Sequence, residues 1–336
     1  MPAGPQPFGA TADGAPVWRT RLAAHGLTAD ILSWGAVLQD LRLAGTAHPL
    51  VLGFPTLAAY EQAPGCLGAI VGRLANRIAG GRAPIAGRAH AFDRNEAGRT
   101  TLHGGREGTG TRPWRIEAWS ESALTLALTL ADGHMGFPGR LDIRATYALA
   151  EGPALSLDIE AGTDAETLCG LAPHSYFNLD GRADIAGHSL RIAAESMLPV
   201  DAAAIPTGEI RPVAGTAFDF RTARALPAAA PGIDHNFCLA EARGALRPVA
   251  TLRAGGLAMT LETTEPGLQV YTAAKLDTSA HPGLTGRPYG PFAGIALEPQ
   301  CWPDAPNQAW AAQARLAPAA HYRHRSVFRF AEAPPP

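Results

Sequence analysis

The chain lacks several features that mark whole classes of protein. Lys275 is the only lysine among the 28 basic residues, so arginine is the default cation and a single arginine carries little functional weight. The net charge of −2 gives no reason to expect nucleic acid or an anionic membrane as a partner. The cysteines are widely spaced and form no C-x-x-C pair, which argues against a zinc module or a disulfide scaffold (Cys66, Cys169, Cys238, Cys301).

Long apolar segments are also missing. No run approaches the ~18 residues that a membrane span requires. Residues Met1–Gly14 have neither the basic start nor the apolar core of a signal peptide. We therefore expect a cytoplasmic protein, and we expect a monomer or a weak homodimer.

Helical patterns are scarce, and Thr56–Gln62 is the best short candidate. Strand patterns are frequent, and the strongest is Leu124–Leu130, which places leucine at every second position. The other expected strands are Trp18–Ala23, Ala29–Leu43 with a break at Gly35, Arg140–Ala148, Ala154–Ala161, Ser189–Ala194, Leu246–Arg253 and Leu257–Thr263. Such strands, separated by Gly/Pro turns, predict an all-β fold, a large antiparallel β-sandwich. We expect one domain over residues 1–336, with a core from about 15 to 331.

The prediction of a ligand site begins with the stretch Leu171–Gly181. Pro173 favours extended geometry, so we expect His174 to start a strand. Along that strand His174, Tyr176 and Asn178 would share one face, which could hold a small polar ligand. A buried structural histidine is the alternative interpretation.

Five other short segments combine polar side chains with glycine or with an apolar strand. Arg77 could place its fork on sugar hydroxyls or a carboxylate, or it could be an ordinary ion-paired arginine. His103 precedes two glycines, where a backbone can approach a ligand closely, or it is a turn residue. Glu298 ends an apolar strand, where solubility does not explain it. The candidate groups are Asn76 and Arg77 in Gly72–Ile78, His103 in Thr101–Gly105, Asp234 in Gly232–Phe237, Gln269 in Glu265–Tyr271 and Glu298 in Gly294–Gln300.

Two other patterns do not predict sites. His321 and His324 have a metal-like spacing, but no Cys, Asp or Glu lies next to them. Gly80-Gly81 lacks the G-x-x-x-x-G-K pattern of a phosphate loop. We therefore expect no metal and no cofactor.

The order of these motifs resembles the aldose 1-epimerase (galactose mutarotase) family. In chain order they read G-R-L-A-N-R-I, T-L-H-G-G, D-G-x-x-G-F-P-G, P-H-S-Y-F-N-L, I-P-T-G-E with F-D-F-R, I-D-H-N-F, P-G-L-Q-V-Y-T and L-E-P-Q-x-W-P-D-A-x-N. The resemblance covers roughly Ala36 to Phe330. It implies a galactose mutarotase-like supersandwich and an isomerase that interconverts the α and β anomers of galactose, glucose or a related free aldose.

The resemblance also implies roles for individual residues. By position in the motifs, His174 corresponds to the general acid and Glu298 to the general base of the family. Its sugar-binding positions correspond to Asn76, Arg77, His103, Asp234 and Gln269. The chain departs from the family at Pro173, where the family often has Asn, which removes one amide next to the acid. It also has Ala319-Ala320-His321 where the family usually has a Gly-Glu turn, for which we expect no catalytic consequence.

The residue types support this chemistry independently of the resemblance. Anomer exchange needs a base for the C1 hydroxyl proton and an acid for the ring oxygen, each typically contributing ~10²–10⁴-fold. No metal, cofactor or covalent nucleophile is required. In the active form we expect Glu298 to be ionised and His174 protonated, on opposite sides of the sugar, since opposite charges close together favour both charged forms.

Three other functions fit parts of the pattern. A glycoside hydrolase could use Glu298 and Asp234 as its two carboxylates, although the 7% aromatic content offers no run of sugar-stacking platforms. A non-catalytic sugar-binding protein would bind both anomers without exchanging them. A hexose-6-phosphate epimerase of the same fold would need an added arginine pair for the phosphate.

Overall fold

The strongest strand pattern of the sequence lies within a nine-stranded antiparallel sheet in the computed structural model, which describes residues 4–229 and 231–333. Leu124–Leu130 falls in β11 (Ala123–Leu130), where every leucine is buried and the residues between them are half-buried or exposed. The remaining strands of this sheet, in spatial order around β11, are β10 (Arg115–Trp119), β12 (Leu141–Ala150), β13 (Ala154–Thr163), β27 (Tyr322–Glu332), β23 (Leu257–Thr263), β22 (Arg247–Ala254), β17 (Ser189–Ile192) and β20 (Arg224–Ala225).

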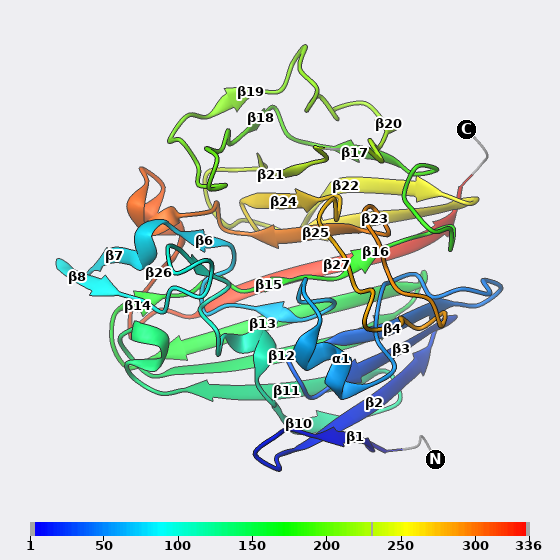
Figure 1. Cartoon of the computed structure of the whole chain (residues 1–336), viewed down its shortest axis with the longest axis horizontal. Coiled ribbons are helices and arrows are strands. Elements are labelled where there is room, and N and C mark those ends of the chain that lie inside the picture. The colour runs from blue at the N-terminus through cyan, green and yellow to red at the C-terminus, as the bar shows by residue number, and fades with distance from the viewer. Residues whose placement is uncertain (1–3, 230, 334–336) are drawn as a thin grey trace.

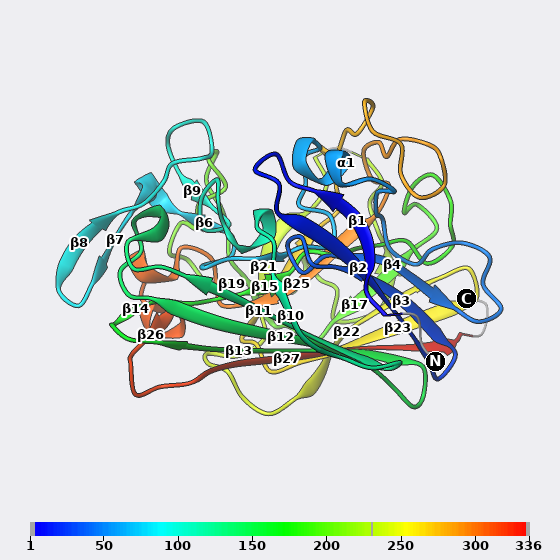
Figure 2. The same cartoon turned by 90° about the horizontal axis from the view of Figure 1, so that it is seen from below.

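Two smaller antiparallel sheets lie over this large one (Figures 1 and 2). The four-stranded sheet runs β1 (Gln6–Ala10), β2 (Pro16–Ala24), β3 (Leu27–Leu32) and β4 (Leu38–Leu43). The six-stranded sheet runs β16 (Tyr176–Phe177), β25 (Ile295–Gln300), β24 (Gly267–Tyr271), β21 (Asp234–Cys238), β18 (Ser196–Met197) and β19 (Arg211–Pro212).

One continuous apolar core joins the three sheets. Phe177 of β16 packs against Phe328 of β27 with ring centroids 5.1 Å apart. Tyr147 of β12 reaches across the layers and donates its hydroxyl hydrogen bond to the carbonyl of Ala36 at 2.9 Å. Sheets that bury their inner faces against one another in this way form a β-sandwich, so the predicted fold class is confirmed.

Short elements fill the ends of the sandwich. The predicted helix is present as α1 (Leu57–Gln62), capped by Thr56, whose hydroxyl accepts a hydrogen bond from the amide of Ala59 at 3.4 Å. Single 3₁₀ turns are η1 (Ala79–Gly81), η2 (Thr109–Thr111), η3 (His134–Gly136), η4 (Ala305–Asn307) and η5 (Ala311–Gln313). Paired two- to four-residue strands are β5 (Ile70–Val71) with β15 (Ala172–Pro173), β6 (Arg77–Ile78) with β9 (Thr101–Leu102), β7 (Arg82–Ile85) with β8 (Arg88–Ala91), and β14 (Thr167–Leu168) with β26 (Arg315–Leu316).

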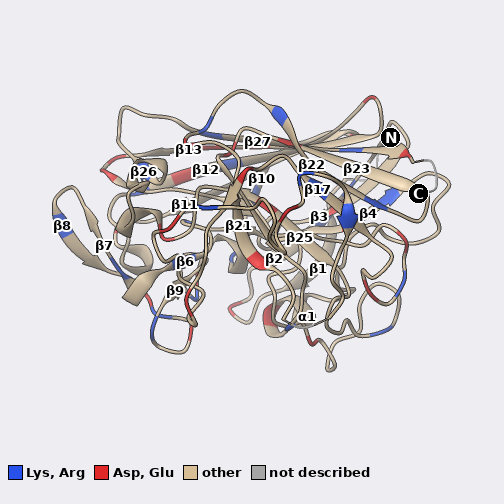
Figure 3. Cartoon of the chain, turned by 90° about the horizontal axis from the view of Figure 1, so that it is seen from above, with Lys and Arg blue, Asp and Glu red and all other residues tan. Residues whose placement is uncertain are grey.

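Charged residues of both signs are scattered over strands and loops (Figure 3). Many are paired on the outer face of the nine-stranded sheet, for example Arg144 with Glu117 at 2.6 Å. Within residues 4–229 and 231–333, no helix is long and apolar enough to cross a membrane.

Candidate active site

The side of the six-stranded sheet that faces away from the core carries polar residues. In β25, Ile295 and Leu297 belong to the core, so alternation places Glu298 on the opposite face. The strand register pairs Glu298 with Gln269 of β24, and Gln269 with Asn236 of β21, which lines up three polar side chains across neighbouring strands. Glu298 is only 2% exposed, because other segments of the chain cover this face.

His174 lies in one of those covering segments and faces Glu298. The histidine follows β15 and precedes β16, so the expectation that it starts a strand was wrong: its backbone amide and carbonyl bond instead to Ala69 (2.8 Å) and Gly68 (3.0 Å). Its Nε2 atom is 3.6 Å from Oε2 of Glu298. The ring is 5.1 Å from that of Tyr176, so these two side chains do lie together as predicted.

Asn178 does not contribute to this face as we expected. Its amide nitrogen donates to the carbonyls of Arg182 (2.9 Å) and Ala293 (2.8 Å), and its oxygen accepts from the amide of Gly181 at 2.9 Å. The side chain is therefore used to fix the turn that follows β16.

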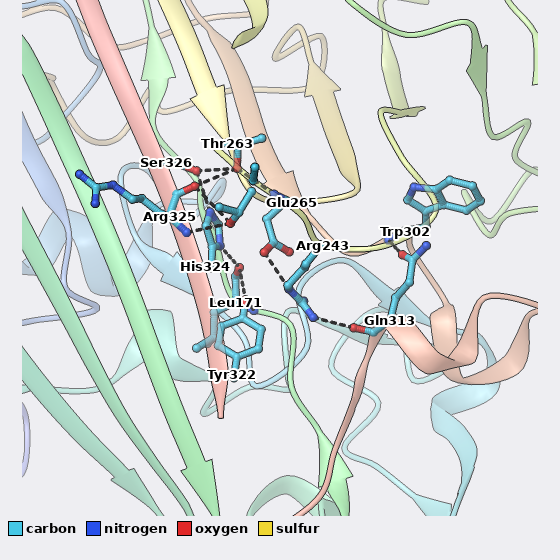
Figure 4. A network of polar contacts seen from close by, with 12 residues as sticks. Leu171, Arg243, Thr263, Glu265, Trp302, Gln313, Tyr322, His324, Arg325 and Ser326 are labelled. Atoms are coloured by element: carbon cyan, nitrogen blue, oxygen red, sulfur yellow. Dashed lines mark hydrogen bonds and ion pairs between the residues drawn. The ribbon is translucent and has the colours of Figure 1, made fainter. Parts of the chain in front are cut away.

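A buried polar network holds the two segments that carry His174 and Glu298 (Figure 4). Tyr322 and His324 of β27 both bond the backbone of Leu171, three residues before His174, at 2.9–3.2 Å. Within the same network Gln313 accepts a hydrogen bond from the amide of Trp302, four residues after Glu298, at 2.9 Å. These contacts anchor both segments to the sheet and to its neighbouring loop.

The network is completed by a buried ion pair. Arg243 contacts Glu265 at 2.7 Å and also donates to the carbonyl of Gln313 at 3.0 Å. Glu265 is fully buried. The pair therefore connects the start of β24, which carries Gln269, with the loop that follows Glu298.

His103 and Asn76 form a second wall of the site. Both have positive φ (52° and 61°), and the amide of His103 donates to the carbonyl of Asn76 at 3.0 Å. The amide of Asn76 in turn donates to Nδ1 of His103 at 3.2 Å, which fixes the ring. The His103 ring packs edge-on against His174 with centroids 5.2 Å apart. His103 is thus both a turn residue and a member of the cluster.

Arg77 follows Asn76 in the chain, and its guanidinium group is already hydrogen-bonded to a carboxylate. Nε and Nη2 donate to the two carboxylate oxygens of Glu96, each at 2.8 Å. The influence of Arg77 on the pKa values of His103 and Glu298 places its charge at the same site. The ion-pair interpretation of Arg77 is therefore confirmed, and contact of Arg77 with a sugar stays a prediction.

Asp234 and Gln269 form the third group. The Gln269 amide nitrogen donates to Oδ1 of Asp234 at 2.6 Å. The Gln269 oxygen is buried and has no hydrogen-bond partner within residues 4–229 and 231–333. Asp234 raises the pKa of Glu298, so these two carboxyl groups are close enough to interact.

Burial controls the protonation of the central pair. Loss of water contact lowers the pKa of His174 to about 4. Burial, followed by the charge of Asp234, raises the pKa of Glu298 well above its ordinary value, against the opposing influence of Arg77. These shifts favour neutral His174 and protonated Glu298, whereas the two charged forms expected for the active form stay a prediction. The shifts arise because burial removes more solvation than the neighbouring charges replace.

Three residues near this cluster were not among the catalytic or sugar-binding residues predicted from the sequence. No role was predicted for Tyr271. It lies two residues from Gln269 on the same strand face, and that spacing could have revealed it. Tyr176 is fully buried, and its pKa is raised mainly by burial and next by Glu298. Glu96 lies in a turn without a recognisable pattern, so only the structure identifies it.

The described part of the chain contains no group of three or more His, Cys, Asp or Glu side chains arranged to hold a metal ion. His324, part of the metal-like spacing, bonds Leu171 with one ring nitrogen and Ser326 with the other, at 3.0 and 2.7 Å.

Two surface hollows of about 660 and 610 Å³ lie away from the cluster. The larger is lined by ion-paired side chains such as Arg144 and Glu117.

The sequence matches the family model for aldose 1-epimerase over residues 19–329. The chain belongs to the aldose 1-epimerase family. It is 38% identical to the galactose mutarotase of Mus musculus over 332 residues, which is 95% of this chain and 96% of that protein. Members of this family are isomerases, and the activity of this chain is the interconversion of the anomers of aldoses.

Solved structures of the family have the same fold. An aldose epimerase homologue from C. elegans superposes with a TM-score of 0.87 at 29% identity, covering 94% of this chain and 99% of that one. A galactose 1-epimerase from Lactobacillus acidophilus gives a TM-score of 0.85 at 26% identity, covering 98% and 99%.

Proposed function

We propose that this aldose 1-epimerase exchanges the anomers of a free aldose such as galactose or glucose with His174 as general acid and Glu298 as general base. The observation that supports this most is the buried contact of 3.6 Å between Nε2 of His174 and Oε2 of Glu298. Two titratable groups that share one dry site can give one proton and take another within the same step.

The reaction requires few groups. Glu298 removes the proton from the C1 hydroxyl while His174 protonates the ring oxygen, and the ring opens to an aldehyde. Rotation about C1–C2 presents the other carbonyl face, and closure with the proton transfers reversed gives the other anomer. Both reacting oxygens are bonded to C1, so an acid and a base side by side suffice, and our expectation of opposite sides is unnecessary.

His174 and Glu298 share one transferable proton. Neutral His174 with protonated Glu298 and the corresponding ion pair differ only in which atom holds that proton. Burial favours the neutral form of both groups, whereas the charge of Arg77 lowers the pKa of Glu298 and favours the ion pair. We propose that the polar groups of the bound sugar complete this shift, so that Glu298 becomes the base.

The surrounding polar groups would orient the sugar ring while leaving C1 free to rotate. The proposed sugar-binding residues are Asn76, Arg77, His103, Asp234 and Gln269. Because Gln269 fixes Asp234 and Asn76 fixes His103, these groups are held before the sugar arrives. We further propose that residues 1–336 act as one domain in the cytoplasm, as a monomer or weak homodimer.

Polarimetry on freshly dissolved α-galactose and α-glucose tests this function against its alternatives. The proposal predicts enzyme-dependent acceleration toward the anomeric equilibrium after the spontaneous rate is subtracted. A sugar-binding protein would leave that rate unchanged. A glycoside hydrolase would instead release reducing sugar from glycosides and would not accelerate the exchange of free anomers.

A further inference from the structure

The Arg77 guanidinium is held on one edge by a carboxylate that has no assigned role. Oε1 of Glu96 accepts from Nη2 of Arg77, and Oε2 accepts from Nε, each at 2.8 Å. Oε2 also accepts from the hydroxyl of Thr100 at 2.6 Å. This is a bidentate pair with a third hydrogen bond on the carboxylate, a geometry that fixes both side chains.

Local backbone structure brings the pair together. β6 and β9 pair Arg77 with Leu102, and the turn that leads into β9 begins at Glu96. That turn is closed by the Glu96 amide, which donates to the Thr100 carbonyl at 3.2 Å, and by the Arg99 amide, which donates to the Glu96 carbonyl at 3.0 Å. The turn is thus fixed to the strand that carries Arg77, and the carboxylate is placed by its own loop.

The pair also sets the charge of the site. The Arg77 side chain is 15% exposed and that of Glu96 is 32% exposed, so water screens the pair only in part. The charges of Asp234 and Glu298 act on Arg77 in addition to that of Glu96. Lys275 acts on Glu96, but it is exposed. The Glu96 carboxylate, paired directly with Arg77, therefore offsets most of the guanidinium charge, and Asp234 adds a second negative charge nearby.

We propose that Glu96 is a specificity-determining residue, which restricts the site to uncharged aldoses by neutralising Arg77 and rejects sugars that carry a carboxylate or phosphate. This inference rests on the proposed function, because it places the sugar against Arg77. Glu96 accepts from Nε and from one N–H of Nη2, which leaves the N–H groups of Nη1 and the second N–H of Nη2 for a sugar hydroxyl. A hydroxyl needs one donor, whereas an anion needs an unmatched positive charge.

The test compares two sugars that differ mainly in charge. D-galactose is neutral, and D-galacturonate carries a carboxylate in place of the C6 hydroxymethyl group. Their anomer exchange is followed by polarimetry at pH 7 with wild type and Glu96→Gln. Removal of the Glu96 charge takes away the bidentate counter-charge of Arg77 and makes the site less negative, so the ratio of kcat/KM for galacturonate to that for galactose should rise about tenfold or more.

Two further variants separate charge from position. Glu107→Gln removes an exposed carboxylate that pairs with Arg112 at 3.1 Å in the segment after β9, and the ratio should stay at the wild-type value. Thr100→Val removes only the hydroxyl bond to Glu96, so KM for galactose should rise while the ratio stays unchanged. Glu96→Ala serves as a second charge-removing variant and should raise the ratio as Glu96→Gln does.

The outcomes also distinguish this inference from the proposed function. Arg77→Ala should raise KM for galactose at least as much as it lowers kcat, and Arg77→Lys should not restore it, because an ammonium lacks the planar fork. Unchanged galactose kinetics in Arg77→Ala would overturn the placement of the sugar. An impaired Arg77→Ala together with unchanged ratios in Glu96→Gln and Glu96→Ala would overturn the role of Glu96 alone.

Discussion

The depressed pKa of His174 makes the stability of the fold depend on pH. Burial lowers this pKa from 6.5 to about 4, so below pH 6.5 the unfolded chain binds a proton that the folded chain does not bind. The folded state therefore keeps its full stability above about pH 6.5 and loses it as the pH falls toward 4. At about 1.4 kcal/mol per pKa unit, the loss attributable to His174 is roughly 2 kcal/mol between pH 7 and pH 4.5.

Urea unfolding followed by tryptophan fluorescence at these two pH values measures the effect. His174→Asn removes the titrating group, so wild type should lose roughly 2 kcal/mol more than the variant on acidification. His103 and His324 also have pKa values lowered mainly by burial, and both proteins retain them, so most of their contributions cancel; only the part of the His103 shift that comes from His174 is lost in the variant. Equal losses in wild type and variant would show that His174 is solvated in the folded protein, and the burial argument would be wrong.

Three further predictions follow from other parts of the structure. Glu265→Ala removes one partner of the buried pair with Arg243 and should lower the unfolding free energy by about 3–5 kcal/mol in urea titrations; a change under about 1 kcal/mol would mean that the pair is solvated. Gln269→Met should raise KM more than it lowers kcat, because Asp234 loses its 2.6 Å hydrogen bond, and unchanged steady-state kinetics would exclude that positioning role. Activity should persist after exhaustive treatment with a chelator, and a loss that zinc or magnesium restores would contradict the metal-free mechanism.

Features that depend on local pattern could be predicted from the sequence. The alternating leucines of Leu124–Leu130 indicate a strand with one buried face, and that strand is present. The short helix is present too, because Thr56 supplies a capping hydroxyl. His174 was misplaced within its segment, since Pro173 predicts extended geometry but says nothing about whether the next residue joins a sheet.

Features that depend on tertiary contacts could not be predicted in the same way. The partner of Arg77 is Glu96, and their contact requires the β6–β9 pairing, which no local pattern indicates. The meeting of His174 with Glu298 followed only from the resemblance to a family, because 124 positions separate them in the sequence. Their protonation depends on burial, which is a property of the assembled fold, and so the pKa shifts of the two groups could not be predicted from the sequence.

The central claim is tested most directly by the rate of α-galactose mutarotation in Glu298→Gln, His174→Asn and the double variant. Glu298→Gln keeps the size of the side chain, and His174→Asn keeps a hydrogen-bonding group in a smaller side chain. Both remove proton transfer, so kcat should fall by about 10²–10⁴ with little change in KM. The double variant should be barely slower than the slower single variant, since the two residues act as one unit. If Glu298→Gln retained more than about a tenth of the wild-type rate, the claim would be contradicted and Asp234 would be the next candidate for the base.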